Sequence, residues 1–246
     1  ASEEEAFFGR PRVEVPLDSR GLRVAKGVKS LREFRRENVT FQAYDYSCGA
    51  AVVSTLLTFF FGEPATEEEV ITGLAQHADL EKLARRRAFS LLDVKKFAVS
   101  QGYEAVGYAM DLEYLASLQQ PAIVPIQPRG YKHFVIVKGI LGGRVHIADP
   151  AFGNYTRSIG RFLGEWSPRV GFLMEREGRD VAPDEEDLRR QASFMGPFAL
   201  RGVSARADRP LTTPGDQVQT LRMPRALGGS PLDFFGVRSS LPPGSP

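Results

Sequence analysis

The sequence predicts an α+β fold in which helices of the first half of the domain pack on an antiparallel sheet formed by the second half. Residues 48–102 carry apolar side chains at helical spacing between capping signals. Residues 103–174 carry short β-branched runs separated by turn signals. With 246 residues, 42% hydrophobic and 25% charged, the chain has the composition of an ordinary globular protein with a sizeable core.

The strongest predicted helix follows Ser47, which is a suitable N-cap residue. Its apolar stretch, Ala50 to Phe61, is well short of the roughly 20 residues that span a bilayer, so we interpret it as a buried helix that ends at Gly62. Capping signals predict further helices over residues 66–76, 90–102 and 111–118, and the basic run 85–87 is interpreted as a solvated helix end.

Strands are predicted where β-branched and aromatic residues cluster, over residues 103–108, 121–126, 133–140, 144–148, 155–159 and 170–174. Gly142-Gly143 joins two of them and is a hairpin signal. The second half of the domain is therefore expected to form an antiparallel sheet.

The chain divides by composition into three segments. Residues 1–37 form a polar N-terminal extension, residues 38–178 the folded domain, and residues 179–246 an extension rich in proline, glycine and arginine. The last segment shows no sustained period, so we expect it to wrap the domain or to be disordered. The first residues, ASEEEAFF, lack an initiator methionine, which is compatible with a secretory signal that has been removed.

Composition argues against several classes of function. The 32 basic and 30 acidic residues leave a net charge of +2, which favours neither nucleic acid nor an anionic membrane as partner. The single cysteine cannot form an intramolecular disulfide, and with three scattered histidines it offers no zinc-binding spacing. No glycine-rich phosphate loop follows a strand. We therefore expect no metal and no other cofactor.

Cys48 is the candidate nucleophile. It lies in the first turn of the strongest helix, where unpaired backbone N–H groups and the helix dipole favour a thiolate. Gly49 is expected to leave the space over the sulfur open to a substrate. Gln42, six residues upstream, can fold back and donate its amide N–H to an oxyanion beside the Cys48 backbone N–H. A lone cysteine is more often a small buried apolar side chain, so this assignment depends on its partners.

Among the three histidines, His133 is the candidate base, because it begins an apolar strand at the rim of the sheet. His77 lies near a helix end, shows no partner among its sequence neighbours and is interpreted as a surface residue. His146 lies three residues before Asp149, so strand alternation places those two side chains on opposite faces.

Asp149 is the candidate carboxylate that orients His133, and this pairing sets a condition on the hairpin. A two-residue loop at Gly142-Gly143 places Asp149 opposite Ile136, on the face away from His133. A three-residue loop that starts at Leu141 places Asp149 diagonal to His133 on the same face. The pairing therefore predicts the three-residue loop. An aspartate before a proline is also common in turns without any catalytic role.

Together these motifs resemble the C39 peptidases, which process bacteriocin leaders: QAYDYSCG over residues 42–49, KHFVIV over residues 132–137 and ADP over residues 148–150. The resemblance implies a papain-like fold, with Gln42 as oxyanion donor, Cys48 as nucleophile, His133 as base and Asp149 as orienter. The sequence has no membrane-spanning segment of the kind that transporter-fused members carry. It looks most like the stand-alone relatives in operons for secreted functional amyloid fibres, which implies a periplasmic enzyme.

The sequence thus predicts a cysteine endopeptidase that hydrolyses a peptide bond in a secreted or exported bacterial protein through a Cys-His-Asp triad. Its expected partners are a peptide or protein substrate and components of fibre assembly or secretion. One alternative is a non-catalytic peptide-binding or chaperone module, and another is transglutaminase or amidase chemistry on the same fold. The double glycine in Leu227-Gly228-Gly229-Ser230 is either a self-processing site or part of a flexible linker.

Overall fold

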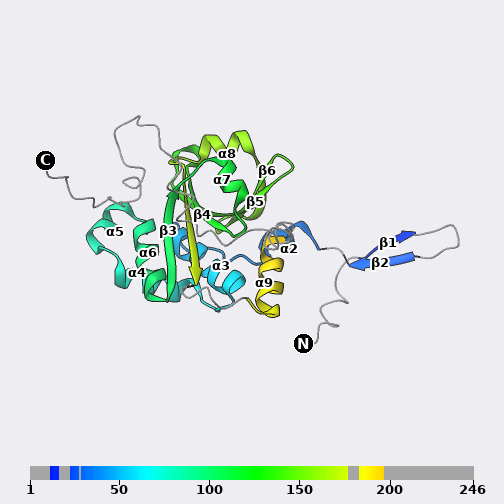
Figure 1. The fold of residues 1–246 in the computed structure, drawn as a ribbon, viewed down its shortest axis with the longest axis horizontal. Coiled ribbons are helices and arrows are strands. Elements are labelled where there is room, and N and C mark those ends of the chain that lie inside the picture. The colour runs from blue at the N-terminus through cyan, green and yellow to red at the C-terminus, as the bar shows by residue number, and fades with distance from the viewer. Residues whose placement is uncertain (1–11, 17–22, 28, 177–182, 197–246) are drawn as a thin grey trace, which may run out of the picture. The chain divides into compact units, whose positions relative to one another are not determined.

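The computed structural model describes residues 12–16, 23–27, 29–176 and 183–196 (Figure 1). The chain forms two compact units, Ala1–Glu37 and Asn38–Pro246, which are described separately. In the first unit, strands β1 (Arg12–Pro16) and β2 (Arg23–Gly27) pair antiparallel. Helix α2 (Leu31–Arg36) begins at a capping box between Ser30 and Glu33.

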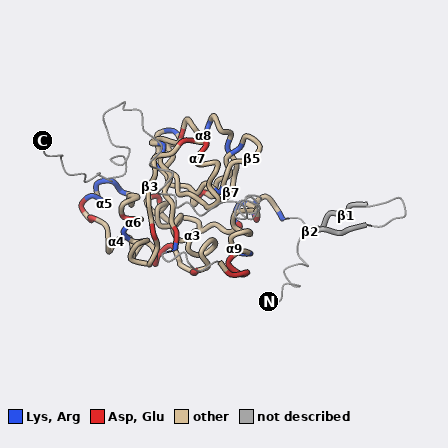
Figure 2. Tube along the Cα trace, viewed as in Figure 1, with Lys and Arg blue, Asp and Glu red and all other residues tan. Residues whose placement is uncertain are grey.

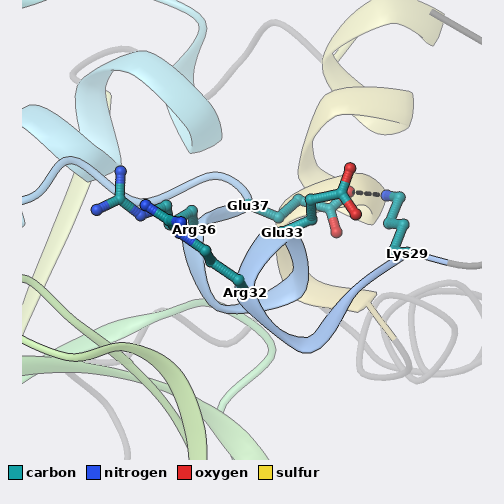
Figure 3. Close-up of a pocket in the computed structure, with 5 residues that line it drawn as sticks. All are labelled: Lys29, Arg32, Glu33, Arg36 and Glu37. Atoms are coloured by element: carbon teal, nitrogen blue, oxygen red, sulfur yellow. Dashed lines mark hydrogen bonds and ion pairs between the residues drawn. The ribbon is translucent and has the colours of Figure 1, made fainter. Parts of the chain in front are cut away.

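A hollow of about 370 Å³ lies on the first unit (Figure 3). Its lining consists of charged side chains from α2 and the residues next to it: Lys29, Arg32, Glu33, Arg36 and Glu37. Lys29 forms an ion pair with Glu37 across it. None of the candidate catalytic residues lines this hollow, so it is not the site that the sequence predicts.

A six-stranded antiparallel sheet forms the centre of the second unit, in the order β3-β8-β4-β5-β6-β7. The strands are β3 (Tyr103–Ala109), β4 (Ala122–Ile126), β5 (His133–Leu141), β6 (Arg144–Asp149), β7 (Gly153–Ser158) and β8 (Val170–Arg176). The predicted α+β class, with an antiparallel sheet in the second half, is confirmed. The strand predicted over residues 155–159 starts earlier, at Gly153, and Ile159 instead begins a helix.

The N-terminal helices of this unit cover one face of the sheet. They are α3 (Cys48–Leu56), the π-helical turn η1 (Leu57–Phe61), α4 (Glu67–His77) and α6 (Leu91–Ser100). Their apolar side chains share one core with Phe134 and Phe172 of the sheet. The predicted buried helix is thus confirmed, and it ends at Gly62, whose φ of 78° is left-handed. Helix α5 (Leu80–Arg86) ends in the basic run and buries none of its residues.

The opposite face of the sheet carries a second core. Helices α7 (Leu112–Ser117) and α8 (Ile159–Glu165) contribute Leu115 and Phe162 to it. From the sheet, Val135 of β5 and Ile147 of β6 lie in the same core. The sheet is therefore a middle layer between two sets of helices. Across the described residues, no helix is long and apolar enough to cross a membrane.

Helix α9 (Glu185–Met195) lies in the segment that we expected to be wrapping or disordered, and the sequence analysis missed it. Asp184 caps it, and its first turn is acidic, as the red segment of α9 in Figure 2 shows. Its last residues, Phe194 and Met195, are buried in the core that α3 shares, and Phe194 meets Phe60 at a ring distance of 6.0 Å. Only two of its residues are buried and most of the others are charged or polar, so by composition the segment resembles the polar extension around it. The double glycine at 228–229 lies outside the described residues.

Candidate active site

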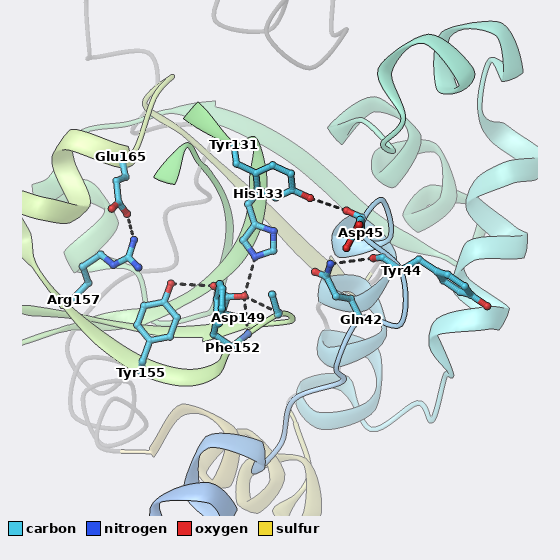
Figure 4. Close-up of polar contacts among 11 residues, drawn as sticks. Gln42, Tyr44, Asp45, Tyr131, His133, Asp149, Phe152, Tyr155, Arg157 and Glu165 are labelled. Atoms are coloured by element: carbon cyan, nitrogen blue, oxygen red, sulfur yellow. Dashed lines mark hydrogen bonds and ion pairs between the residues drawn. The ribbon is translucent and has the colours of Figure 1, made fainter. Parts of the chain in front are cut away.

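The three candidate catalytic residues lie at the ends of three elements of the second unit. Cys48 is the first residue of α3, His133 the first of β5 and Asp149 the last of β6. All are buried, with 4%, 3% and 1% of their surfaces exposed. Figure 4 shows the His133 and Asp149 side chains turned toward each other. Residues 16 positions apart in the sequence thus meet inside the fold.

The hairpin between β5 and β6 differs from the predicted one. Leu141 pairs directly with Arg144, so Gly142-Gly143 is a two-residue loop. Both glycines have positive φ, 57° and 73°, as a tight type I′ turn requires. The three-residue loop that we expected is therefore wrong, because two glycines can form the turn without strain.

A β-bulge at Lys138 produces the one-residue shift in register between β5 and β6 that the two-residue loop does not produce. Lys138 is an extra residue on β5 between two regular pairs. Those pairs are Val137 with Ile147 and Gly139 with His146. The extra residue moves Asp149 to the diagonal position relative to His133, on the same face of the sheet. The condition inferred from the sequence is met, but by a different device.

Asp149 is held by four hydrogen bonds (Figure 4). Its Oδ1 atom accepts from His133 Nε2 at 2.8 Å and from the backbone N–H groups of Ala151 and Phe152 at 2.8 and 3.3 Å. Its Oδ2 atom accepts from the Tyr155 hydroxyl at 3.0 Å. The carboxylate therefore both closes the turn after β6 and orients the imidazole. Asp149 is thus a turn residue before a proline and the partner of His133 at the same time.

The imidazole of His133 has one ring nitrogen left for a second partner. Its Nδ1 atom is buried and has no hydrogen-bond partner. Burial by itself lowers the pKa of His133, but the hydrogen bond to Asp149 and the interaction with Cys48 outweigh burial and raise this pKa to about 9. Cys48 is thus close enough to act on the imidazole, although its sulfur is not in hydrogen-bond geometry with Nδ1. The surroundings favour an imidazolium beside the sulfur.

Cys48 lies at the N-terminus of α3 as predicted, but Ser47 does not cap the helix. The Ser47 hydroxyl donates to the Tyr44 carbonyl at 2.8 Å and accepts from the Tyr44 N–H at 3.2 Å. It therefore closes the loop before the helix, and none of the described side chains caps α3. The N–H groups of the first turn stay available for an anion near the sulfur.

Gly49 has a different role from the one that we expected. A β-carbon on Gly49 would lie 3.4 Å from the Phe89 Cβ atom and 3.7 Å from the Phe134 ring. Gly49 therefore faces the core between α3 and β5, and not the space over the sulfur. Its small size serves the packing of the helix that carries Cys48 against the strand that carries His133.

Gln42 is tied to the turn that follows Asp149. Its backbone N–H donates to the Pro150 carbonyl at 2.9 Å. Its side-chain Nε2 donates to the Tyr44 carbonyl at 3.0 Å, which uses one of its two N–H groups, and its Oε1 is buried without a partner. The second N–H of this amide can donate a hydrogen bond to an oxyanion.

The other two histidines do not take part in this arrangement. His77 ends α4, and its Nε2 meets the Ser100 hydroxyl at 3.1 Å, a partner 23 residues away that its sequence surroundings did not show. His146 is half-buried on β6 opposite Gly139. Burial, followed by the charges of Arg144 and Lys138, lowers the pKa of His146. His133 is therefore the histidine that lies beside Asp149 at the candidate site.

Two tyrosines near the site escaped the sequence analysis, Tyr155 and Tyr131. The Tyr131 ring lies 6.1 Å from the His133 ring, and its hydroxyl donates to the Asp45 carbonyl at 2.8 Å (Figure 4). Burial, followed by the charges of Cys48 and Asp45, raises the pKa of Tyr131. Tyr131 thus connects the residues before β5 to the loop before α3. Its position two residues before His133 was the available signal.

A buried cysteine at a helix N-terminus, beside an imidazole that a buried carboxylate holds, is an arrangement that cysteine peptidases use. Within the described ranges, no group of three or more histidine, cysteine and acidic residues is placed to hold a metal ion. The chain belongs to the peptidase C39 family, whose sequence profile matches residues 36–178. The resemblance inferred from the motifs is therefore confirmed.

Two similar proteins carry the name probable functional amyloid protease FapD. The protein from Pseudomonas aeruginosa is 40% identical over 157 residues, which are 64% of this chain and 69% of that protein. The protein from Pseudomonas fluorescens is 38% identical over 162 residues, which are 66% and 71% of the two chains.

Solved structures of peptidase domains also match. The peptidase domain of Streptococcus ComA, a bifunctional ABC transporter, has a TM-score of 0.48 at 18% identity and covers 56% of this chain and 98% of its own. A double glycine motif protease from an AMS/PCAT transporter, in complex with a leader peptide, has a TM-score of 0.48 at 24% identity and covers 59% and 96%.

The raised pKa of His133 makes a prediction about stability. Because the folded value of about 9 exceeds the ordinary value of 6.5, the contribution of His133 is fully present below pH 6.5 and is lost as the pH rises through 9. We expect the free energy of unfolding to fall by ~1–3 kcal/mol across this window, relative to a His133→Gln variant. Urea denaturation at several pH values measures this difference. Equal pH dependence in the two proteins would contradict it.

Proposed function

We propose that this chain is a cysteine endopeptidase whose catalytic residues are Cys48, His133 and Asp149. The observation that carries the proposal is the buried 2.8 Å hydrogen bond between His133 Nε2 and Asp149 Oδ1, beside Cys48 at the start of α3. Membership of the peptidase C39 family supports the same class of reaction.

In the proposed reaction, the Cys48 thiolate attacks the carbonyl carbon of the scissile peptide bond and forms a carbon–sulfur bond. The carbonyl oxygen becomes an oxyanion that accepts hydrogen bonds from N–H groups of the first turn of α3 and from the second amide N–H of Gln42. The His133 imidazolium protonates the leaving amine, and the carbon–nitrogen bond breaks. Water then attacks the thioester while His133 takes up its proton, which releases the acid and restores the thiolate.

Exposed aromatic side chains around these residues support a polypeptide as the substrate. In the described part of the second unit, four aromatic residues are exposed: Tyr44, Tyr46, Tyr131 and Phe152. Each lies within four residues of Cys48, His133 or Asp149 in the sequence, and the Tyr44 and Tyr46 rings stack 5.4 Å apart. Exposed aromatic rings that gather at one place are typical of surfaces that contact other polypeptides.

The similarity to proteins named probable functional amyloid protease supports a more specific substrate. We propose that the substrate is an exported protein that takes part in fibre formation. The proposal includes a periplasmic location and partners from fibre assembly or secretion.

The proposal is tested by exposing the full chain to a library of peptides prepared from a bacterial proteome. New amino termini are identified by mass spectrometry and compared with those from a sample whose Cys48 was first alkylated with iodoacetamide. We expect a set of cleavage sites that appears with the native chain and is absent after alkylation. Peptides that are retained but uncut by both samples would instead establish a binding module. Cross-linked or deamidated products would establish the other acyl-transfer chemistry.

A further inference from the structure

We infer that Tyr155 is a positioning residue of the catalytic site, one that keeps the Asp149 carboxylate oriented toward His133. The inference rests on the proposed function. Tyr155 is half-buried on β7, and its hydroxyl donates to Asp149 Oδ2 at 3.0 Å (Figure 4). The hydroxyl thus acts on the reaction through the carboxylate and the imidazole.

The two carboxylate oxygens of Asp149 accept different numbers of hydrogen bonds. Oδ1 already accepts three N–H groups, from His133 and from the turn at Ala151 and Phe152. Oδ2 accepts from Tyr155 and from no other residue that the structure describes. Because Asp149 is 1% exposed, no bulk solvent replaces a missing donor. The Tyr155 hydroxyl is therefore the described group that satisfies the hydrogen bonding of Oδ2.

The sheet itself places Tyr155 at this position. Asp149 pairs with Gly153 across β6 and β7, and Tyr155 lies two residues farther along β7. Tyr155 is therefore the diagonal neighbour of Asp149 on the same face of the sheet. Gly153 has no side chain that could lie between them. The same diagonal relation, set on the other side by the bulge at Lys138, brings His133 to Asp149.

Contacts with two further residues restrict the Tyr155 ring. The Arg157 guanidinium lies 5.0 Å from the ring centroid, in cation–π geometry. Arg157 in turn forms an ion pair with Glu165 of α8 (Figure 4). These contacts restrict the ring, so its hydroxyl is presented to Asp149 before a substrate arrives.

Loss of the hydroxyl has a defined chemical consequence. Oδ2 of Asp149 loses its only donor among the described residues, so the carboxylate is held less firmly toward His133 and the hydrogen bond that stabilises the imidazolium weakens. A less stable imidazolium supports the Cys48 thiolate less well, so a higher pH is needed to make the sulfur reactive. Burial, followed by the charge of Asp149, raises the pKa of Tyr155, so the hydroxyl stays a donor across the neutral range.

The test compares the full native chain with Tyr155→Phe and with Tyr103→Phe as a matched control. Tyr103 is equally a tyrosine of the sheet, on strand β3, and its buried ring lies 4.7 Å from the Phe61 ring, away from the Asp149 carboxylate. The rate of Cys48 alkylation by iodoacetamide is measured by intact mass from pH 5 to pH 9. We expect the acid limb of the profile to move upward by about 0.5–1 pH unit in Tyr155→Phe and to stay in place in Tyr103→Phe.

Each outcome decides one point. Identical profiles for the native chain and Tyr155→Phe would overturn the role of Tyr155 while leaving the proposed function intact. An ordinary thiol profile in the native chain would overturn both. Tyr155→Phe removes a single oxygen atom, so thermal unfolding should show a folded protein. The ring signals of His133, resolved from those of His77 and His146 by isotope labelling, should change in Tyr155→Phe only.

Discussion

Replacing Cys48 with alanine is expected to abolish cleavage of every peptide that the native chain cuts. The expected loss in kcat is about 10⁶-fold, the size found when the nucleophile of a peptidase is removed. The physical reason is that Cys48 is the only cysteine of the chain, and water is a far weaker nucleophile than a thiolate. The measurement is kcat on peptides recovered from the library.

The matched control for this change is Cys48→Ser, which keeps nearly the same shape and replaces the thiol with a hydroxyl. Serine lacks the acidity of a thiol, so both variants should be inactive and both should remain folded. Peptide binding should survive in both, because the exposed aromatic residues around the site are unchanged. Turnover within about 100-fold of the native rate in Cys48→Ala would rule out this mechanism.

Replacing Asp149 with alanine is expected to lower kcat by about 10³–10⁴-fold, because the imidazole loses the acceptor that fixes its orientation. The change also leaves the N–H groups of Ala151 and Phe152 and the Tyr155 hydroxyl without their acceptor. We therefore expect a loss of ~1–3 kcal/mol in the free energy of unfolding. Steady-state kinetics and urea denaturation measure the two effects.

Asp149→Asn separates charge from hydrogen bonding. An asparagine oxygen can still accept from His133 and from the turn, while its amide nitrogen faces Tyr155, whose hydroxyl can rotate to accept. We expect this variant to be nearly as stable as the native chain and to lie between it and Asp149→Ala in activity. Native activity in both variants would show that the carboxylate only closes the turn after β6.

The candidate residues of the site could be selected from sequence because each has a local signal. Cys48 starts an apolar helix, His133 starts an apolar strand, and Asp149 precedes a proline that ends a strand. Even the register followed in part, since the side-chain period of two requires an odd shift if His133 and Asp149 are to share a face. The β-bulge at Lys138 that produces the shift was not predicted, although Gly139, an isolated glycine inside the apolar run, was the available signal for it.

Neither helix α9 nor the role of Tyr155 was predicted from the sequence, because both depend on contacts between distant segments. Only the last turn of α9 is buried, against residues more than 100 positions earlier, so its stability depends on a distant core. Tyr155 looks like an ordinary strand residue until β6 and β7 pair. Its hydroxyl then meets a carboxylate six residues away in sequence but adjacent in space.

The sequence by itself determined the class of fold, the family and the candidate catalytic residues, because periodicity, capping and motif spacing are local properties of the chain. Only the tertiary structure decided which nitrogen of His133 meets Asp149 and which hydroxyl donates to Oδ2 of that aspartate. It also decided that Gly49 packs against the core and that the Ser47 hydroxyl bonds the Tyr44 backbone. Those features depend on strand pairing and on the packing of α3 against β5. Such contacts join residues far apart in the chain, and their geometry exists only once the core has closed.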